Sequence, residues 1–254
     1  MAKPLENKLA LVTGSSRGIG AAIAIRLAAE GASVIVNYAA SPARGEAVVN
    51  EIKKAGGQAE AVGADLSSID GIKTLISSVD KVFGGKFGGR LDILVNHAGT
   101  VDRGPFLDSS DQSYDKQFDL NVRPVVELSK DAAKRMVKAG WGRIINIGSA
   151  SGEAAPLGGL SLYIATKFAV HGFTRGLSRE LGPTGITVNG IQPGPIDTEL
   201  SPEDGPASEV MKKRTSVGRY GRVEEIASAA AFLANPESAF INGENLTVDG
   251  GWNA

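Results

Sequence analysis

The chain has 254 residues and a nearly balanced charge, with 27 Lys and Arg against 28 Asp and Glu. This balance disfavours a nucleic-acid binder, which usually carries a basic excess, and it offers no polybasic patch for a membrane surface. The chain has no cysteine and two histidines, which excludes disulfides, thiolate metal sites and cysteine nucleophiles. Every apolar run is shorter than the ~18 residues of a membrane-spanning helix. With no recognisable signal peptide, we expect a cytoplasmic protein of one domain, residues 1–254, that binds no metal.

Short apolar runs alternate along the chain with longer segments of helical periodicity. Seven of the runs are predicted to be strands: Leu9–Val12, Ser33–Val36, Ala59–Val62, Leu91–Val95, Arg143–Ile147, Ile186–Ile191 and Asn245–Val248. Several are almost wholly apolar, as in parallel sheets with helices on both faces. The helical segments include one that runs through Glu30 and two longer ones, Val122–Ala139 and Leu160–Leu181. The alternation predicts an α/β fold, a doubly wound Rossmann domain with a seven-stranded parallel sheet.

A glycine-rich segment joins the first predicted strand to the first helix. It reads Thr13-Gly14-Ser15-Ser16-Arg17-Gly18-Ile19-Gly20, with the spacing GxxxGxG in place of the more common GxGxxG. Glycines let the backbone approach a pyrophosphate, and a helix N-terminus presents free N–H groups to it. A turn packed with small residues is the alternative, but the position after the first strand favours dinucleotide binding. The predicted contacts here are Gly14, Ser16, Arg17, Gly18, Ile19 and Gly20.

Further motifs follow the later strands. Asn96-His97-Ala98-Gly99 closes the fourth strand, Ser149 lies 14 residues before Tyr163, Lys167 follows Tyr163 by four, and Pro193-Gly194 follows the sixth strand. In this order the motifs resemble those of the short-chain dehydrogenase/reductase family over essentially the whole chain, in particular its 3-oxoacyl carrier-protein reductase-like members. The family usually has Asn where this chain has His97. We interpret His97 as a buried, hydrogen-bonded side chain, with a pH-sensitive group near the nicotinamide as the alternative.

The resemblance implies a catalytic tetrad of Asn121, Ser149, Tyr163 and Lys167. Tyr163 and Lys167 stand at i and i+4 and share one helix face, where an ammonium stabilises a phenolate. The expected mechanism delivers hydride from the nicotinamide to a carbonyl carbon while Tyr163 protonates the oxygen, Ser149 orients it and Lys167 binds the ribose. A nucleophilic serine is disfavoured because the surroundings lack the G-x-S-x-G pattern. Asn121 is expected to begin the helix of Val122–Ala139 as its N-cap and, by resemblance, to hold a water linked to Lys167.

The residues after the second strand bear on the choice of dinucleotide. An acidic residue there normally accepts the ribose 2′-hydroxyl of NAD, but here the segment reads Asn37-Tyr38-Ala39-Ala40-Ser41. No carboxylate repels a 2′-phosphate, and Arg17, Ser41 or Arg44 could bind it. NADP(H) is therefore the predicted cofactor, with NAD(H) as the alternative. Outside the glycine segment, the predicted cofactor contacts are Asn37, Tyr38, Ser41, Asp65, Leu66, Asn96, Ala98, Gly99, Tyr163, Lys167, Pro193, Gly194, Ile196 and Thr198.

The substrate pocket is expected beyond the carboxyl ends of the strands. Its candidate residues are Arg103, Ala150, Ser151 and Leu157, under a lid around residues 195–215. The predicted activity is oxidoreduction of a small-molecule carbonyl or secondary alcohol, for example a 3-oxoacyl thioester or a small ketone. An NAD-dependent alcohol or sugar dehydrogenase and a non-catalytic cofactor-binding regulator remain as alternatives, because fold and motifs do not choose a substrate. By resemblance, and from apolar residues spread around the two long helices, we expect a homotetramer.

Overall fold

The computed structural model describes residues 3–155 and 158–254. Seven parallel strands form one sheet in the order β3-β2-β1-β4-β5-β6-β7. The strands are β1 (Leu9–Val12), β2 (Ser33–Tyr38), β3 (Gln58–Gly63), β4 (Ile93–Asn96), β5 (Gly142–Ile147), β6 (Ile186–Pro193) and β7 (Asn245–Val248). The predicted fold is confirmed, and no predicted strand end moves by more than two residues.

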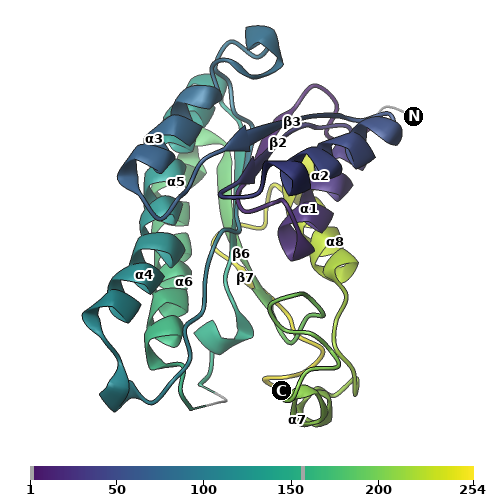
Figure 1. Cartoon of the computed structure of the whole chain (residues 1–254). Helices are drawn as coiled ribbons and strands as arrows, with labels where there is room; N and C mark the ends of the chain where they lie inside the picture. Colours follow the sequence, from purple (N-terminus) through teal and green to yellow (C-terminus); the bar gives the residue numbers. More distant parts are fainter. Residues whose placement is uncertain (1–2, 156–157) are drawn as a thin grey trace.

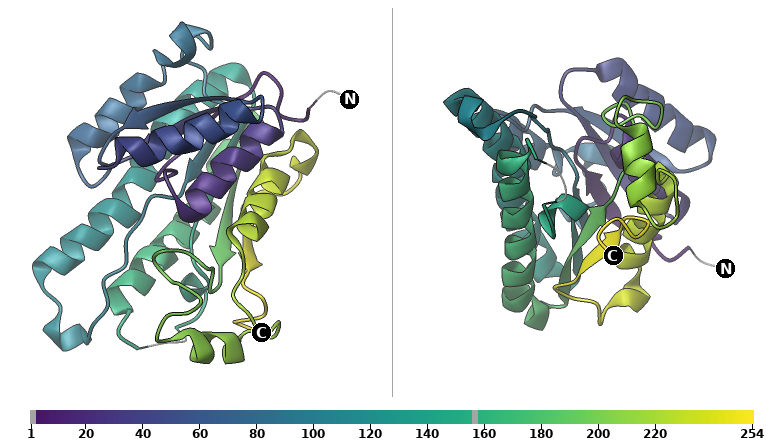
Figure 2. Two further views of the ribbon diagram at one scale, coloured as in Figure 1. Left: turned by 45° about the vertical axis from the view of Figure 1, so that its right-hand side comes forward. Right: turned by 90° about the horizontal axis from the view of Figure 1, so that it is seen from below.

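Helices cover both faces of this sheet (Figure 1; Figure 2). One layer consists of α1 (Gly18–Ala29), α2 (Pro42–Lys54) and α8 (Val223–Ala234). The opposite layer consists of α3 (Ile69–Ser78), α4 (Asp111–Asn121), α5 (Arg123–Ala139) and α6 (Ser161–Leu181). The short α7 (Ser208–Arg214) lies near the C-terminus, away from both layers. No helix within the described residues is long and apolar enough to cross a membrane.

The first strand shows why the strands are almost wholly apolar. Successive side chains of a strand point to opposite faces of the sheet. Ala10 and Val12 therefore pack into the core beside α1 and α8, whereas Leu9 and Leu11 pack into the core beside α3 and α5. All four residues are buried, because a helix layer covers each face.

The strand order places two sequence motifs at the same edge of the sheet. β1 pairs with β2 on one side and with β4 on the other, in register Leu9↔Ser33 and Ala10↔Ile93. The chain therefore reverses its direction of travel across the sheet at β1, and ligands of such folds bind outside the carboxyl ends of the strands at this point. The glycine segment follows β1 and the Asn96–Gly99 motif follows β4, so both lie at this edge.

The helix boundary near residue 121 differs from the prediction. Asn121 is the last residue of α4, and α5 begins at Arg123 with Pro124 in its first turn. Val122 between them, with φ −118° and ψ −54°, departs from regular helical geometry. The prediction that Asn121 is the N-cap of the helix of Val122–Ala139 is therefore wrong. Its side chain instead bonds to the segment after β4 and to α6, which holds it at the end of α4.

Candidate active site

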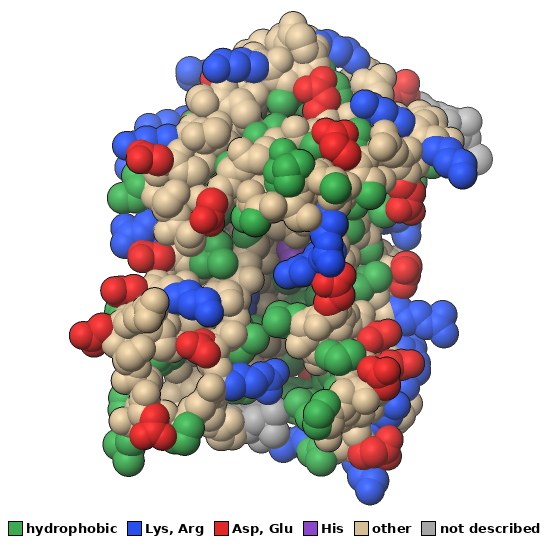
Figure 3. Space-filling view, viewed as in Figure 1, with side chains coloured by type: hydrophobic (Ala, Val, Ile, Leu, Met, Phe, Trp, Pro, Cys, Tyr) green, Lys and Arg blue, Asp and Glu red, His purple; other side chains and the backbone are tan. Residues whose placement is uncertain are grey.

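A cavity of about 790 Å³ opens at the carboxyl edge of the sheet. The molecule is hollowed on this side, with Lys and Arg side chains around the opening (Figure 3). Most of the predicted site residues line it: Gly14, Ser16, Arg17, Gly18, Ile19, Asn37, Tyr38, Ser41, Asp65, Leu66, Ala98, Gly99, Ser149, Tyr163, Lys167, Pro193, Gly194, Ile196 and Thr198. The predicted site residues Gly20, Asn96 and Asn121 are not among the lining residues. Their contacts with residues around the cavity are described below.

Two glycines of the segment after β1 are required by its geometry. Gly14 has φ +60°, and an added Cβ would lie 3.0 Å from the Cα of Ala98. An added Cβ at Gly20 would lie 2.6 Å from the carbonyl oxygen of Gly14 and 2.6 Å from Nδ1 of His97. A side chain at either position would push the segments after β1 and β4 apart. Glycine therefore keeps these two segments in contact under the cavity.

The N-terminus of α1 is available to an anionic ligand. The helix starts at Gly18, no described side chain caps its first turn, and this turn contains no acidic residue. Its free N–H groups and dipole therefore favour a negative charge in the cavity. Arg17 and Arg44 add two guanidinium groups to the same wall. Together with the close-packed glycines, this donor set fits the phosphates of a dinucleotide.

The side chain of Asn37 braces the backbone at the end of β2. Its Oδ1 accepts a hydrogen bond from the N–H of Gly14 at 3.1 Å, and its Nδ2 donates to the carbonyls of Ala64 at 3.1 Å and Val62 at 3.3 Å. The residue is buried although it lines the cavity. Asn37 therefore positions the glycine segment, and its amide is already engaged by backbone groups.

Thr13 and Asn96 hold the ends of β1, β4 and β5 together. The Oγ1 of Thr13 accepts hydrogen bonds from the N–H groups of His97 at 2.9 Å and Ala98 at 3.0 Å. The buried Nδ2 of Asn96 donates to Oδ1 of Asn146 on β5 at 2.8 Å. These bonds fix the floor of the cavity, and Asn96 contributes to it from within the sheet.

His97 is a neutral, hydrogen-bonded side chain at this floor. Its Nδ1 lies 3.2 Å from the carbonyl oxygen of Thr13. Burial, followed by the positive charge of Lys167, lowers the pKa of His97 from 6.5 to about 4. The imidazole is therefore uncharged near neutral pH, which favours the packing interpretation over a pH-sensitive role.

Tyr163, Lys167 and Ser149 meet on one wall of the cavity. Tyr163 and Lys167 lie one turn apart on α6, with Nζ of Lys167 5.6 Å from the centre of the Tyr163 ring. This Nζ donates a hydrogen bond to the carbonyl of Ile147, at the end of β5, at 3.2 Å. The buried ammonium acts strongly on its neighbours because little water screens it. The Oγ of Ser149 accepts from the N–H of Ser151 at 3.1 Å, so its hydroxyl proton can be donated to a substrate oxygen.

Asn121 connects α4 to this group of residues. Its Oδ1 accepts from the N–H of Thr100 at 2.7 Å, and its Nδ2 donates to Oγ1 of Thr166 on α6 at 3.0 Å. An added Cβ at Gly99 would lie 3.1 Å from Oδ1 of Asn121 and 3.8 Å from Nζ of Lys167. Asn121 therefore lies near the ammonium, and a water held between them stays a prediction.

Gln192 is a positioning residue that the sequence analysis missed. It is buried on β6, its Oε1 accepts from the N–H of Ser149 at 2.7 Å, and its Nε2 donates to Oδ1 of Asn245 on β7 at 3.1 Å. A Cβ at Gly148 would overlap with this amide. The backbone of Ser149 is therefore held from behind by β6. The sequence does place a glutamine directly before Pro193-Gly194. We did not assign it to the sheet because the predicted strand ended at Ile191, one residue earlier.

Comparison with known proteins gives the family. Residues 14–253 match the model of a family described as enoyl-(acyl carrier protein) reductase. A 3-oxoacyl-[acyl-carrier-protein] reductase of Staphylococcus aureus is 38% identical over 96% of this chain and 97% of its own. A cyclic-di-GMP-binding biofilm dispersal mediator protein of Escherichia coli is 37% identical, with coverage of 97% and 98%. A short-chain dehydrogenase of Burkholderia cenocepacia, solved in complex with NADP, matches with TM-score 0.92 and 42% identity over 99% of this chain and 100% of its own. The chain belongs to the short-chain dehydrogenase/reductase family. The short-chain dehydrogenases/reductases are a family of oxidoreductases.

The cavity also includes residues that the sequence analysis did not place there. These are, among others, Val101, Leu120, Leu160 and Trp252. Glu199 and Met211, from the segment 195–215 that was predicted to cover the pocket, line the cavity as well. The predicted pocket residues Arg103, Ala150 and Ser151 also line the cavity, whereas Leu157 lies outside the described residues. Trp252 and Met211 pack with Ala150, directly after Ser149. The segment 195–215 and the end of the chain therefore meet beside Ser149.

Proposed function

We propose that this protein is an NADP(H)-dependent oxidoreductase that acts on a carbonyl or secondary-alcohol substrate. The observation that carries the proposal is the meeting of Tyr163, Lys167 and Ser149 on the wall of the cavity that the glycine segment also lines. A dinucleotide held by its phosphates at the glycine segment would extend toward these three side chains.

Each of the three residues on this wall has a different role in the proposed proton transfer. When bound, the reduced nicotinamide supplies hydride to the carbonyl carbon. Tyr163 donates its phenolic proton to the substrate oxygen as negative charge develops there. The Ser149 hydroxyl donates a hydrogen bond to the same oxygen, because its own Oγ already accepts from Ser151. The Lys167 ammonium stabilises the phenolate that Tyr163 becomes. In the reverse direction, Tyr163 removes the proton of the alcohol.

Two arginines support NADP(H) as the cofactor. Arg17 and Arg44 line the cavity beside the end of β2, where the sequence from Asn37 to Ser41 has no carboxylate. Guanidinium groups bind phosphate oxygens well. The relative from Burkholderia cenocepacia, solved in complex with NADP, supports the same choice. NAD(H) is the alternative.

The apolar part of the cavity supports a substrate with an apolar group. Leu160, Met211 and Trp252 line the cavity, and Met211 and Trp252 pack with Ala150, next to Ser149. This lining suits a small ketone or a 3-oxoacyl thioester, the substrate class in the name of the Staphylococcus aureus relative. Residues 195–215 form the lid in this proposal. Assembly as a homotetramer and a cytoplasmic location are also proposed, from the family resemblance and the sequence.

A turnover assay tests the proposal. The purified protein is mixed with NADPH or NADH and a panel of ketones and 3-oxoacyl thioesters, and nucleotide oxidation is followed by absorbance. We expect turnover of at least one substrate, with a higher kcat/KM for NADPH. A folded protein that binds NADPH but turns over none of the panel would favour the non-catalytic regulator, and a higher kcat/KM for NADH would favour the NAD-dependent alternative.

A further inference from the structure

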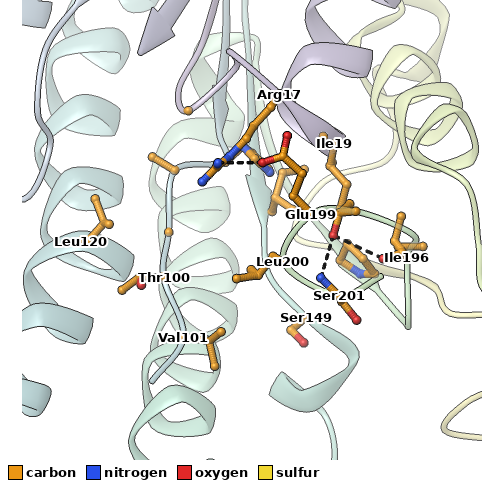
Figure 4. Close-up of a pocket in the computed structure, with 18 of the residues that line it drawn as sticks. Arg17, Ile19, Thr100, Val101, Leu120, Ser149, Ile196, Glu199, Leu200 and Ser201 are labelled. Atoms are coloured by element: carbon orange, nitrogen blue, oxygen red, sulfur yellow. Dashed lines mark hydrogen bonds and ion pairs between the residues drawn. The ribbon is translucent and has the colours of Figure 1, made fainter. Parts of the chain in front are cut away.

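Glu199 lies at the tip of a turn at the start of the lid. The backbone groups of Thr198 and Ser201 bond to each other in both directions, at 3.3 and 3.0 Å, and close the turn. Glu199 and Leu200 form its tip and line the cavity. Figure 4 shows the side chains of Glu199 and Arg17 directed toward each other across the cavity. The lid therefore presents a carboxylate to the glycine segment.

This carboxylate bridges two arginines from separate parts of the chain. Its Oε2 lies 3.0 Å from Nη1 of Arg17 and 2.9 Å from Nη1 of Arg44, and its Oε1 lies 3.2 Å from the same nitrogen of Arg44. The hydrogen bond from Arg44, together with both guanidinium charges, lowers the pKa of Glu199. Glu199 is therefore ionised near neutral pH, and it neutralises part of the positive charge at this end of the cavity.

The two arginines stand where a 2′-phosphate would need them. They line the same cavity as Tyr38 and Ser41, after β2, the position at which a fold of this type holds the adenosine ribose. Carboxylate and phosphate oxygens accept hydrogen bonds from the same guanidinium N–H groups. A 2′-phosphate and the carboxylate of Glu199 therefore require the same donors.

We propose that Glu199 is a specificity-determining residue that competes with the 2′-phosphate of NADP(H) for Arg17 and Arg44. The inference rests on the proposed dinucleotide cofactor and adds a residue that reduces its preference for the phosphorylated form. NADP(H) displaces the carboxylate from the arginines, whereas NAD(H), which has a 2′-hydroxyl, leaves both ion pairs intact. The backbone bonds between Thr198 and Ser201 close the turn without the Glu199 side chain, so the exchange breaks none of the bonds that hold the turn.

The expected effect on NADP(H) affinity is modest because the three side chains are exposed to solvent. The side chains of Arg17, Arg44 and Glu199 are 61%, 47% and 59% exposed, and water and salt screen exposed ion pairs. Removing the competing charge should therefore strengthen NADP(H) binding by about 3- to 10-fold. The gain should shrink at high salt, because screening weakens each of the competing contacts.

The test measures binding directly. Wild type, Glu199→Gln and the control Glu209→Gln are titrated with NADP⁺, NAD⁺, 2′,5′-ADP and 5′-AMP by calorimetry. Glu209 is an exposed acidic residue of α7 that is not among the residues lining the cavity, so its substitution removes the same charge from the lid elsewhere. We expect Glu199→Gln to bind NADP⁺ and 2′,5′-ADP about 3- to 10-fold more tightly. Affinities for NAD⁺ and 5′-AMP, and all affinities of the control, should stay within about 2-fold of wild type.

The outcomes separate the two proposals. Equal or weaker NADP⁺ binding by Glu199→Gln overturns the competition, and a weaker value means that Glu199 holds the arginines in place for the phosphate. An equal gain for NAD⁺ and NADP⁺ overturns it too, because a general charge effect would then explain the result. In an Arg44→Ala background, the gain from Glu199→Gln should fall to below about 3-fold. Wild type that binds neither NADP⁺ nor NAD⁺ would instead overturn the proposed function.

Discussion

A single hydroxyl separates Tyr163 from phenylalanine, and that hydroxyl carries the proposed proton transfer. Tyr163→Phe leaves Lys167 and its bond to Ile147 in place, so the fold and NADPH affinity should be retained. We expect kcat to fall at least ~100-fold, the lower end of contributions from general acid–base catalysis. Steady-state kinetics with a circular dichroism control checks this expectation. A folded variant with nearly normal kcat would remove Tyr163 from the mechanism.

The partly buried imidazole of His97 should make the protein less stable in acid. Burial and the charge of Lys167 lower the pKa of His97 from 6.5 to about 4. Between these two values the unfolded chain binds more protons than the folded one, so the free energy of unfolding falls as the pH decreases. This contribution is fully present above about pH 6.5, the pKa of an unperturbed histidine. About 2–3 kcal/mol should be lost by pH 4.

The variant His97→Asn tests whether His97 causes this pH dependence of stability. His97→Asn removes the titrating group and introduces the amide that the family usually has there. Urea unfolding between pH 4 and pH 7 should show a smaller pH dependence for the variant than for wild type. Burial also lowers the pKa of His171. This residue is present in both proteins, so its contribution to the pH dependence largely cancels in the comparison. Parallel stability profiles of wild type and variant would contradict the assignment.

Asn37 shows what the sequence can and cannot predict at a single residue. Its place at the end of the second strand predicts that it belongs to the site, but the direction of its side chain depends on backbone groups of β3 and the glycine segment. Asn37→Asp would replace a donor by a carboxylate facing the carbonyls of Val62 and Ala64. We expect a loss of about 2–4 kcal/mol in the free energy of unfolding.

Ser41→Asp is the matched control for Asn37→Asp, because it adds the same charge at the N-cap position of α2. Aspartate is favourable at an N-cap, so stability measured by denaturant unfolding should not fall, while the added charge should weaken NADP⁺ binding. Equal stability losses in the two variants would show that added charge, and not the lost hydrogen bonds, is responsible.

At the scale of elements, the ends of β5 and β6 are coupled through Gln192. Gln192→Ala removes the acceptor for the N–H of Ser149, so the Ser149 hydroxyl should be held less well in the position that the transition state needs. We expect kcat to fall about 10-fold with a smaller change in KM, since positioning acts on the reacting oxygen.

Asn189→Ala controls for destabilisation of the same strand. The Asn189 amide makes two hydrogen bonds to backbone groups, at Ile241 and Glu244, and is not among the residues that line the cavity. This variant should lose stability with kcat unchanged below its unfolding range. Equal falls in kcat for both variants would indicate a general loss of folding.

Helix boundaries were less predictable than strands because their cause lies elsewhere in the fold. A buried strand is marked by its own apolar run, as Leu9–Val12 and Asn245–Val248 show with unchanged ends. The break at Val122 is different, because it depends on hydrogen bonds of Asn121 to Thr100 and Thr166, 21 and 45 residues away. The sequence therefore predicted the residue as part of the site and missed the element to which it belongs.

For the whole molecule, motif order predicted which segments line one cavity, but it did not predict the paths of the loops. Parallel strands bring their carboxyl ends to one edge, so the motifs after β1, β4, β5 and β6 had to meet there. The position of the segment 195–215, the proposed lid, follows no such rule. Arg17 and Glu199 are 182 residues apart, and periodicity carries no information about where an irregular segment returns. The cavity wall was therefore predictable, whereas the carboxylate across its opening was not.

The structure also revises the argument for assembly. Val125, Leu128 and Met136 fall on one face of α5 and, like Val170 of α6, are buried within the chain's own fold. They need no second subunit to cover them. What remains on α6 is a half-exposed Phe168, with Gly172 and Gly176 following at i+4 and i+8 on the same face. We therefore expect subunits to meet along this face.

Gly172→Arg tests that interface with little strain on the subunit. No atom of the described residues other than those of adjoining backbone lies within 4 Å of a Cβ built at Gly172. Arginine is also a better helix former than glycine by ~1 kcal/mol, so the fold should be retained. The new side chain would, however, hold two closely packed helices apart and bury a charge between them. Light scattering at micromolar concentration should give a tetramer for wild type and a smaller mass for the variant, with Glu209→Arg on α7 as the control. A wild-type mass of 26.2 kDa, or an unchanged tetramer in Gly172→Arg, would contradict an interface on this face of α6.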